Sequence, residues 1–184
     1  MLAHRLTDTA HLRLLEERDA SELYALIDRN RTHLSRWMPW AAGQTEAGTL
    51  EFIRLTRRQL ADNDGIQTAI VADGAIAGMV GLHSVAWGDA STSIGYWLAE
   101  PYQHRGLMTA AVRAYIELVF GAWGLNRLEL GAAVENERSR AVARRLGFRE
   151  EGIRREAETV GGHRHDLVVY GLLAADWRAR PAAP

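Results

Sequence analysis

The sequence of 184 residues contains no cysteine and no lysine. Without cysteine, the chain has no disulfide, no thiolate metal site and no cysteine acyl-enzyme. All 22 basic residues are arginine, which excludes a Walker lysine, a Schiff-base lysine and a pyridoxal phosphate site. Genome composition is the simplest explanation of this bias, and the exclusions hold either way.

Long apolar runs and a large net charge are also lacking. No apolar run approaches the roughly 18 to 20 residues of a membrane span, and residues 1–5 are not followed by the apolar core of a signal peptide. We therefore expect a cytoplasmic protein that does not enter a membrane. The formal net charge of −1 gives no overall electrostatic reason to bind nucleic acid or an anionic surface.

The length and composition favour one globular domain. Hydrophobic residues make up 47% of the chain and charged residues 24%, which is enough apolar side chain for a sizeable core. No linker, repeat or low-complexity segment divides the chain. We expect a single domain over residues 1–180, followed by a flexible tail of proline and alanine at 181–184.

Periodicity in the first part of the chain predicts a strand followed by two helices. Residues 11–16 alternate well enough for a strand, and Asp19 and Glu22 match a capping box that opens a helix. A loop rich in tryptophan then leads to Thr45, the expected cap of a second helix. The buried face of the first helix is expected at Leu23, Leu26, Ile27 and Leu34.

Three strands should follow at 67–72, 76–87 and 91–98, separated by turn dipeptides that are typical of an antiparallel meander. From Gly106 the period becomes helical. A strand at 127–132, a short helix, and two more strands complete the chain. The short helix should span about 137–146 and end at Gly147, and the last two strands should begin at Phe148 and cover 167–173. This order predicts one mixed α/β (α+β) sheet flanked by helices.

The turn between the strand at 91–98 and the next helix is a candidate phosphate cradle. Unpaired N–H groups and the positive end of the helix dipole make this turn an anion site, and Gly106 lets a phosphate approach the backbone. His104 and Arg105 add donors. An ordinary strand-turn-helix connection remains the alternative. Neither the P-loop pattern nor the G-x-G-x-x-G fingerprint is present.

Two segments carry a family resemblance. Gln103-x-x-Gly106-x-Met108 resembles the Q/R-x-x-G-x-G/A pyrophosphate motif of the GNAT superfamily of N-acetyltransferases. Met108 departs from the usual small residue, as is common in the RimJ/RimL branch, the ribosomal-protein N-terminal acetyltransferases. Residues 136–148 are similar to the family's N-x-x-S-x-x-[AV]-x-x-x-x-G-F helix.

The resemblance covers nearly the whole chain and implies a fold and a cosubstrate. It implies a mixed, mostly antiparallel sheet of about seven strands, splayed in a V between the strands at 91–98 and 127–132. Acetyl-CoA would enter this V, with its pantetheine arm paired to Tyr96–Leu98 like an added strand. The cofactor-binding residues expected on this basis are Tyr96, Trp97, Leu98, Gln103, His104, Arg105, Gly106, Leu107, Met108, Thr109, Asn136 and Ser139.

The resemblance also implies catalytic residues. In RimL-type enzymes the catalytic glutamate falls nineteen residues after the motif serine, the spacing from Ser139 to Glu158. Glu156 is the competing candidate, since alternation places both glutamates on one strand face, where pairing with a nearby arginine is the alternative. We expect a partly buried Glu158 with a raised proton affinity. Ser139 either hydrogen-bonds the departing sulfur or caps its helix.

Other polar and aromatic residues have competing interpretations. Asn136 would hold an amide of the pantetheine arm, or is a plain helix cap. Trp37 and Trp40 are candidates for the acceptor pocket, although tryptophan is equally a core residue. The seven arginines from Arg138 to Arg155 would contact the 3′-phosphate of the cofactor, an acidic protein partner or RNA, or only keep the helix soluble. Two histidines at 163–165 lack a third ligand, so we expect no metal.

The function that this interpretation predicts is transfer of acetyl from acetyl-CoA to a primary amine, the N-terminal α-amine of a ribosomal protein. An α-amine with a pKa near about 8 loses its proton more easily than lysine does. The alternatives are a small amine, such as a polyamine, amino acid or antibiotic, and a non-catalytic CoA-binding module. An RNA-binding module is the least favoured, and homodimers are frequent in this branch.

Overall fold

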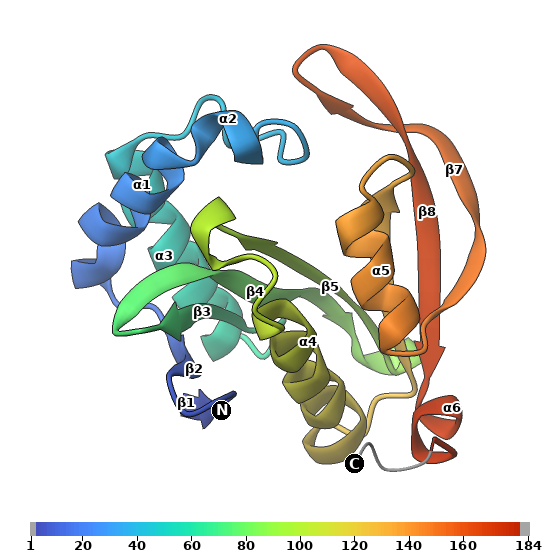
Figure 1. Ribbon diagram of the computed structural model, residues 1–184. Helices are drawn as coiled ribbons and strands as arrows, with labels where there is room; N and C mark the ends of the chain where they lie inside the picture. Colours follow the sequence, from blue (N-terminus) through green and yellow to red (C-terminus); the bar gives the residue numbers. More distant parts are fainter. Residues whose placement is uncertain (1–2, 181–184) are drawn as a thin grey trace.

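The computed structural model describes residues 3–180, which form one sheet of eight strands in the order β1-β2-β3-β4-β5-β6-β8-β7 (Figure 1). Every neighbouring pair is antiparallel except β5 and β6, which are parallel. The strands are β1 (Ala3–Arg5), β2 (Ala10–Leu14), β3 (Gln67–Ala72), β4 (Ala75–Ala86), β5 (Ser91–Leu98), β6 (Arg127–Ala133), β7 (Arg149–Val160) and β8 (His163–Leu173).

Helices cover both faces of this sheet. The α-helices are α1 (Ala20–Arg29), α2 (Arg31–Leu34), α3 (Glu46–Ala61), α4 (Leu107–Glu117), α5 (Glu137–Arg145) and α6 (Ala174–Arg178). Short 3-10 or π segments are η1 (Glu17–Asp19), η2 (Trp87–Asp89), η3 (Glu100–Tyr102) and η4 (Leu118–Ala122). Within residues 3–180, none of these helices combines the length and apolarity needed to cross a membrane.

Two apolar clusters show which helices share a face. Buried residues of α4 and α5, such as Val112 and Ala143, pack with Leu82 and Leu130 of the sheet. On the opposite face, α1 and α3 pack against β3 and β4. Side chains alternate along a strand, so consecutive residues of β5 belong to different clusters. The sheet therefore has two faces, one covered by α4 and α5 and the other by α1 and α3.

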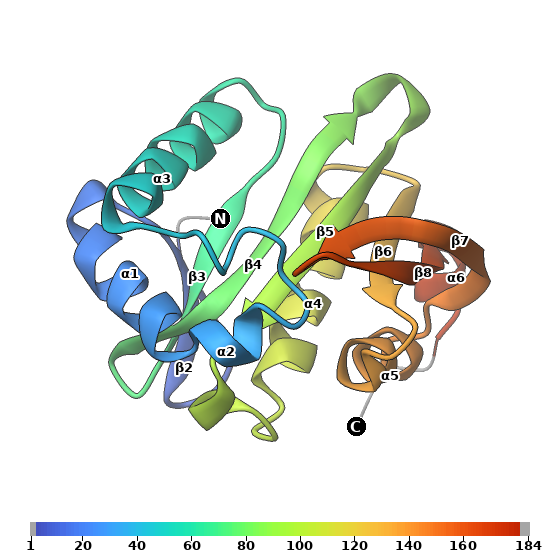
Figure 2. The same ribbon diagram turned by 90° about the horizontal axis from the view of Figure 1, so that it is seen from above.

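The sheet opens at its centre, between β5 and β6. Only Ser91–Ser93 of β5 pairs with β6, through Arg127–Glu129. Beyond these residues β5 stays paired with β4 alone, while β6 turns away to pair with β8. The resulting divergence is visible in Figure 2. The V-shaped splay and the mixed, mostly antiparallel sheet expected from the resemblance are confirmed.

The structure differs from the sequence-based expectation in the number and bounds of the strands. The sheet has eight strands rather than about seven, because the three residues of β1 also pair with β2. Strand β8 begins at His163, four residues before the predicted start, because Gly161 and Gly162 adopt positive φ and make a tight hairpin turn. The predicted tail at 181–184 lies outside the described residues.

The first helical region also differs. The predicted Asp19–Glu22 capping box is wrong, because Asp19 accepts instead from Arg13 and from the Glu16 N–H, and Glu22 accepts from the Ile76 N–H. The single helix expected through Leu34 is broken at Asn30. The Asn30 side-chain amide donates to the Leu26 carbonyl and accepts from the Glu100 N–H, so Asn30 is tied both to α1 and to the segment after β5.

Other local predictions are confirmed. Leu23, Leu26 and Ile27 are buried on α1, and Leu34 is buried on α2. The Thr45 hydroxyl accepts from the Gly48 N–H at 3.0 Å and caps α3, as expected from the sequence. The second helix therefore begins where the capping residue predicts.

Candidate active site

One large cleft of about 2130 Å³ runs through the opening of the sheet and onto both of its faces. Its walls come from β5 and β6, the beginnings of α4 and α5, the loop after α2, and β7. The residues predicted for cofactor, catalysis and acceptor all line this cleft: Trp37, Trp40, Tyr96, Trp97, Leu98, Gln103, His104, Arg105, Gly106, Leu107, Met108, Thr109, Asn136, Ser139 and Glu158. The structure brings them together, and their individual roles stay predictions.

The turn before α4 has the backbone geometry of an anion site. Gly106 precedes the helix with φ of +74°, and apart from its chain neighbours no atom of the described residues lies within 4 Å of the position that a Cβ would occupy there. Over residues 3–180 no side chain accepts from the N–H groups of the first turn of α4, which lie at the positive end of the helix dipole. This geometry fits a diphosphate.

The polar side chains of the same turn are held by neighbours. The Gln103 amide contacts His33 Nε2 at 2.8 Å and accepts from Arg138. Arg105 makes a bidentate ion pair with Asp73 at 2.7 and 3.1 Å, which occupies the guanidinium that the sequence suggested as a free donor. The backbone N–H groups are thus the donors that stand free for a ligand.

The free edge of β5 suits an extended ligand. Residues Tyr96–Leu98 pair with β4 on one side, and within residues 3–180 no strand pairs with them on the side of β6. A strand that lacks a neighbour presents a row of unpaired N–H and C=O groups, which an extended chain of amides can pair with. A pantetheine arm, which contains two amides, matches this edge.

A pair of hydroxyl groups lies on the α4–α5 face of the opening. The Tyr96 hydroxyl is 3.0 Å from Ser139 Oγ and 3.3 Å from the Ser139 carbonyl. Burial raises the pKa of Tyr96 to about 12, so the phenol keeps its proton at neutral pH. The Ser139 hydroxyl faces across to β5 and does not cap its own helix. The cap of α5 is Asn136, whose Oδ1 accepts from the Ser139 N–H at 3.2 Å.

Glu158 and Glu156 lie in different environments. Glu158 lines the cleft and is half-buried, and burial raises the pKa of its carboxyl while His165, its neighbour on β8, lowers it. Glu156 is exposed and pairs with Arg164 at 2.7 Å. The expected common face is wrong, because a bulge between Arg154 and Glu158 interrupts the alternation and gives Glu156 a φ of +48°.

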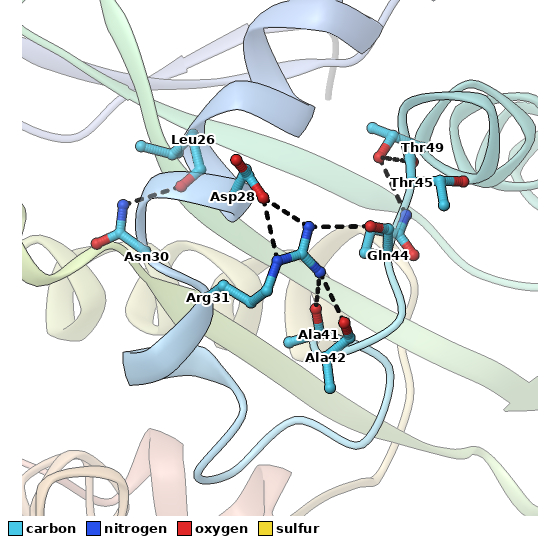
Figure 3. A network of polar contacts seen from close by, with 9 residues as sticks. All are labelled: Leu26, Asp28, Asn30, Arg31, Ala41, Ala42, Gln44, Thr45 and Thr49. Carbon is cyan, nitrogen blue, oxygen red and sulfur yellow. Dashed lines mark hydrogen bonds and ion pairs between the residues drawn. The ribbon is translucent and has the colours of Figure 1, made fainter.

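The loop after α2 places two tryptophans at the cleft, and Arg31 fixes that loop (Figure 3). The Arg31 guanidinium donates to the carbonyls of Ala41, Ala42 and Gln44 and also pairs with Asp28. The loop contacts the rest of the site through rings. Trp37 lies 6.3 Å from His165 and Trp40 lies 6.0 Å from Trp97, measured between ring centroids.

The remaining candidates are mostly accounted for by contacts within the chain. Arg140 donates to the Val134 carbonyl and to Tyr170, and Arg144 pairs with Glu137. Arg145 donates to Thr109 at 2.9 Å, beside the cradle. Over residues 3–180 no three histidine or acidic side chains are grouped closely enough to hold a metal ion.

Several residues of the cleft were missed in the sequence. His33 and Arg138 approach the cradle from distant helices, and His83 and Ser93 contact each other on the α1–α3 face. Side chains alternate along a strand, so His83 is expected on the face opposite to that of its buried neighbour Leu82. No local pattern indicates which distant residues meet there.

Comparison with known proteins agrees with this geometry. The family model described as an acetyltransferase (GNAT) domain matches residues 10–149. The Bacillus subtilis (strain 168) protein named "Putative ribosomal N-acetyltransferase YdaF" is 40% identical over 96% of this chain and 98% of its own length. The ribosomal-protein-serine acetyltransferase of Escherichia coli (strain K12) is 26% identical over 92% of this chain and 95% of its own.

A solved structure of an acetyltransferase is also similar to this chain. The microcin C7 self-immunity acetyltransferase MccE, in complex with acetyl-CoA and AMP, superimposes with a TM-score of 0.86 and 28% identity, covering 91% of this chain and 94% of that one. The family model spans more than half of the sequence, and the YdaF relative aligns over nearly all of it. The chain therefore belongs to the GNAT acetyltransferase family and is an N-acetyltransferase related to the RimJ/RimL enzymes.

Proposed function

We propose that this enzyme transfers the acetyl group of acetyl-CoA to a primary amine by direct attack within a ternary complex. The observation that carries the proposal is the open edge of β5, flanked by the α4 cradle at one end and by Ser139 and Glu158 at the other. The bound acetyl-CoA of MccE, a structural relative at 28% identity, supports the choice of cosubstrate. Acetyl-CoA supplies the activated acyl group, and the chain supplies position and protons.

The two faces of the opening have different chemical tasks in this proposal. Side-chain alternation along β5 turns Tyr96 toward the α4–α5 cluster and Trp97 toward the α1–α3 cluster. Ser139 and Tyr96 hydroxyls on the first face donate to the thiolate as the carbon–sulfur bond breaks. The amine approaches from the other face, where Glu158 accepts a proton as the carbon–nitrogen bond forms.

Cysteine-based acyl transfer is excluded, since the chain has no cysteine, and this favours direct attack. A serine hydroxyl is a weak acid beside a thiol whose pKa is near about 8.5, so a hydrogen bond to the sulfur describes the role of Ser139 better than full proton transfer. Developing negative charge on the thioester oxygen requires a donor, and the unpaired N–H groups of β5 near Trp97 and Leu98 are suited to it.

For the acceptor we propose the N-terminal α-amine of a ribosomal protein. The names of the YdaF relative and of the Escherichia coli serine acetyltransferase support this choice. An α-amine, with a pKa of about 8, is also easier to deprotonate than a lysine side chain, with a pKa of about 10.4. The broad cleft between α3 and the β7–β8 hairpin leaves room for a peptide behind the amine.

A small-molecule amine is the second candidate. The likeness to MccE, an immunity acetyltransferase solved with AMP beside acetyl-CoA, favours it. Both candidates use the same sheet opening and the same catalytic residues. They differ only in what fills the acceptor side of the cleft.

The test is a measurement of CoA release from acetyl-CoA with N-terminal peptides of ribosomal proteins and, in parallel, with polyamines, amino acids and aminoglycosides. Wild type, Glu158→Gln and Ser139→Ala are compared. We expect the peptides to give the highest kcat/KM and both variants to be slower. Equal turnover in the three proteins would remove the catalytic assignments, and a clear preference for a small amine would replace the acceptor.

Oligomeric state and location also belong to this proposal. We expect a cytoplasmic homodimer, as the RimJ/RimL resemblance implies. Light scattering coupled to size exclusion measures the mass directly, and a mass close to the 20.5 kDa of one chain would exclude the dimer.

A further inference from the structure

His83 belongs to no part of the mechanism above, yet it lies on the acceptor face beside the opening. It is on β4 and is exposed to the cleft. Its Nδ1 is 2.9 Å from the Ser93 hydroxyl on β5. Ser93 is the last residue of β5 paired with β6, so the contact marks the apex of the V.

The glycine at position 95 lets the imidazole lie against β5. A Cβ on Gly95 would be 2.8 Å from both Cε1 and Nε2 of His83, too close for an unshifted ring. Nε2 therefore lies over the backbone that immediately precedes Tyr96–Leu98, the proposed binding edge. No hydrogen bond to this nitrogen is formed by the described residues, whereas Nδ1 is occupied by Ser93.

The proton balance of the reaction requires a second proton acceptor besides Glu158. A protonated amine loses two protons on becoming an amide, and one proton is taken up by the departing thiolate. Glu158 takes the proton that leaves nitrogen as the carbon–nitrogen bond forms, and one proton returns to the thiolate, so that one proton in all is released to solvent. We infer that His83 Nε2 accepts the other proton of nitrogen from the incoming ammonium, which delivers a neutral amine to the thioester. This inference rests on the proposed acetyl transfer and names a second catalytic residue for it.

The protonation properties of His83 suit this task. Loss of hydration lowers the pKa of the imidazole, and no charged neighbour contributes to the shift. The ordinary pKa of histidine, about 6.5, lies closer to that of an α-amine, about 8, than the ordinary pKa of glutamate, about 4.3, does, and the lowering by lost hydration reduces this advantage. Loss of hydration therefore favours the neutral form of the ring, which is the form that accepts a proton.

The charged groups around His83 are largely engaged elsewhere. Glu129, which is opposite Ser93 on β6, accepts from Arg127 at 2.8 Å. Asp64, in the loop after α3, accepts from the Val85 N–H. On the facing walls of the cleft are Glu51 of α3, and Arg154 and Glu158 of β7. These groups affect the titration indirectly, so the test includes a control that keeps all of them.

The experiment is a pH profile of kcat/KM from pH 5.5 to 9 for wild type, His83→Gln and His83→Ala, with whichever amine the wild type acetylates best. Glutamine places an amide near the position of Nε2 but does not titrate. We expect both variants to lose about tenfold to a hundredfold in kcat/KM and the acidic limb of the profile to change shape. His163→Gln, an exposed histidine outside the cleft, is the matched control and should behave like wild type.

Two further measurements keep the inference separate from the proposed function. Thermal melting and calorimetric CoA affinity should be unchanged in His83→Gln, which excludes misfolding. Nitrogen-resolved NMR should place the neutral imidazole proton on Nδ1, leaving Nε2 bare. A wild-type pH profile in His83→Gln, or a proton on Nε2, would overturn the inference. Failure of the wild type to acetylate any amine would instead overturn the proposed function, and the NMR result would still decide the state of His83.

Discussion

The cofactor cradle and the acceptor face are built in different ways. The cradle is one continuous segment, residues 103–109, whose shape depends on two left-handed residues, His104 and Gly106, and the start of one helix. The acceptor face is assembled from the loop after α2, from β4 and β5, and from the β7–β8 hairpin. The cradle is thus a local backbone feature, whereas the acceptor face is a product of tertiary structure. We expect changes in the two regions to affect different kinetic parameters.

The largest effect should come from Glu158→Gln, on the acceptor face. If the carboxylate is a general base, kcat/KM should fall by about a hundredfold to ten-thousandfold, while affinity for CoA is unchanged. Glu156→Gln is the matched control, because Glu156 is two residues away, exposed and paired with Arg164. Equal losses in both variants would show that the hairpin, and not the Glu158 carboxylate, is responsible.

The pH dependence of Glu158 has a defined sign. Burial raises the pKa of this carboxyl, so the base is lost by protonation as pH falls, and kcat/KM should decrease on the acidic side. A raised carboxyl pKa also means that the folded state binds this proton more tightly than the unfolded chain does, so its contribution to stability declines as pH rises through that pKa. Glu158→Gln should therefore melt at neutral pH no lower than wild type, as calorimetry can check.

The next largest effect should be that of Gly106→Ala, in the cradle. The left-handed φ of +74° costs a residue with a Cβ about 1 to 2 kcal/mol, and the new methyl occupies the open space proposed for the diphosphate. The KM for acetyl-CoA should rise about tenfold or more. Gly124→Ala is the control, since Gly124 has φ of +63° and equally open surroundings far along the chain. If Gly106→Ala and Gly124→Ala raise the KM for acetyl-CoA by the same factor, the increase comes from backbone strain and not from loss of phosphate contact.

Ser139→Ala should have a smaller effect. One hydrogen bond to the departing sulfur is worth about 1 kcal/mol, or roughly fivefold in kcat. The Tyr96 hydroxyl keeps a partner in the carbonyl of residue 139 at 3.3 Å, so the fold should be undisturbed. Tyr96→Phe and the double variant should give non-additive losses if the two hydroxyls act as a unit. Ser84→Ala, on the exposed part of β4, serves as the control.

The smallest effect should follow from Arg31→Ala. This change removes the donors that hold the carbonyls of Ala41, Ala42 and Gln44, and so loosens the loop that carries Trp37 and Trp40. We expect a several-fold rise in KM for the acceptor, with KM for acetyl-CoA unchanged. Arg29→Ala, an exposed residue at the end of α1, is the matched control. A change in the cofactor KM instead would contradict the division of the site into two regions.

The same division explains what the sequence predicts well. The sequence predicts the meander strands, the Thr45 cap and a glycine turn at Gly106 because each depends on neighbours in sequence, and the structure has all three. The cradle and the helix of residues 136–148 could be named because each is one segment with a recognisable motif. The V between β5 and β6 followed from family resemblance and not from any local pattern.

Long-range contacts account for the parts that the sequence did not predict. Asn30 breaks the first helix through a bond to the distant Glu100 N–H, and Asp19 is drawn to Arg13 instead of capping α1. The bulge that separates Glu156 from Glu158 depends on the register of the β7–β8 hairpin. His83 and Ser93 meet only when β4 and β5 pair. Each of these depends on tertiary pairing that a single sequence does not specify.

Calorimetric titration of the wild-type protein with CoA, and separately with pantetheine, tests the central claim most directly. If the backbone N–H groups at the start of α4 bind the diphosphate and the edge of β5 binds the arm, CoA should bind clearly and pantetheine far more weakly, and Gly106→Ala should reduce only the difference between them. No heat of binding with CoA, or equal affinity for the two ligands, would contradict the account.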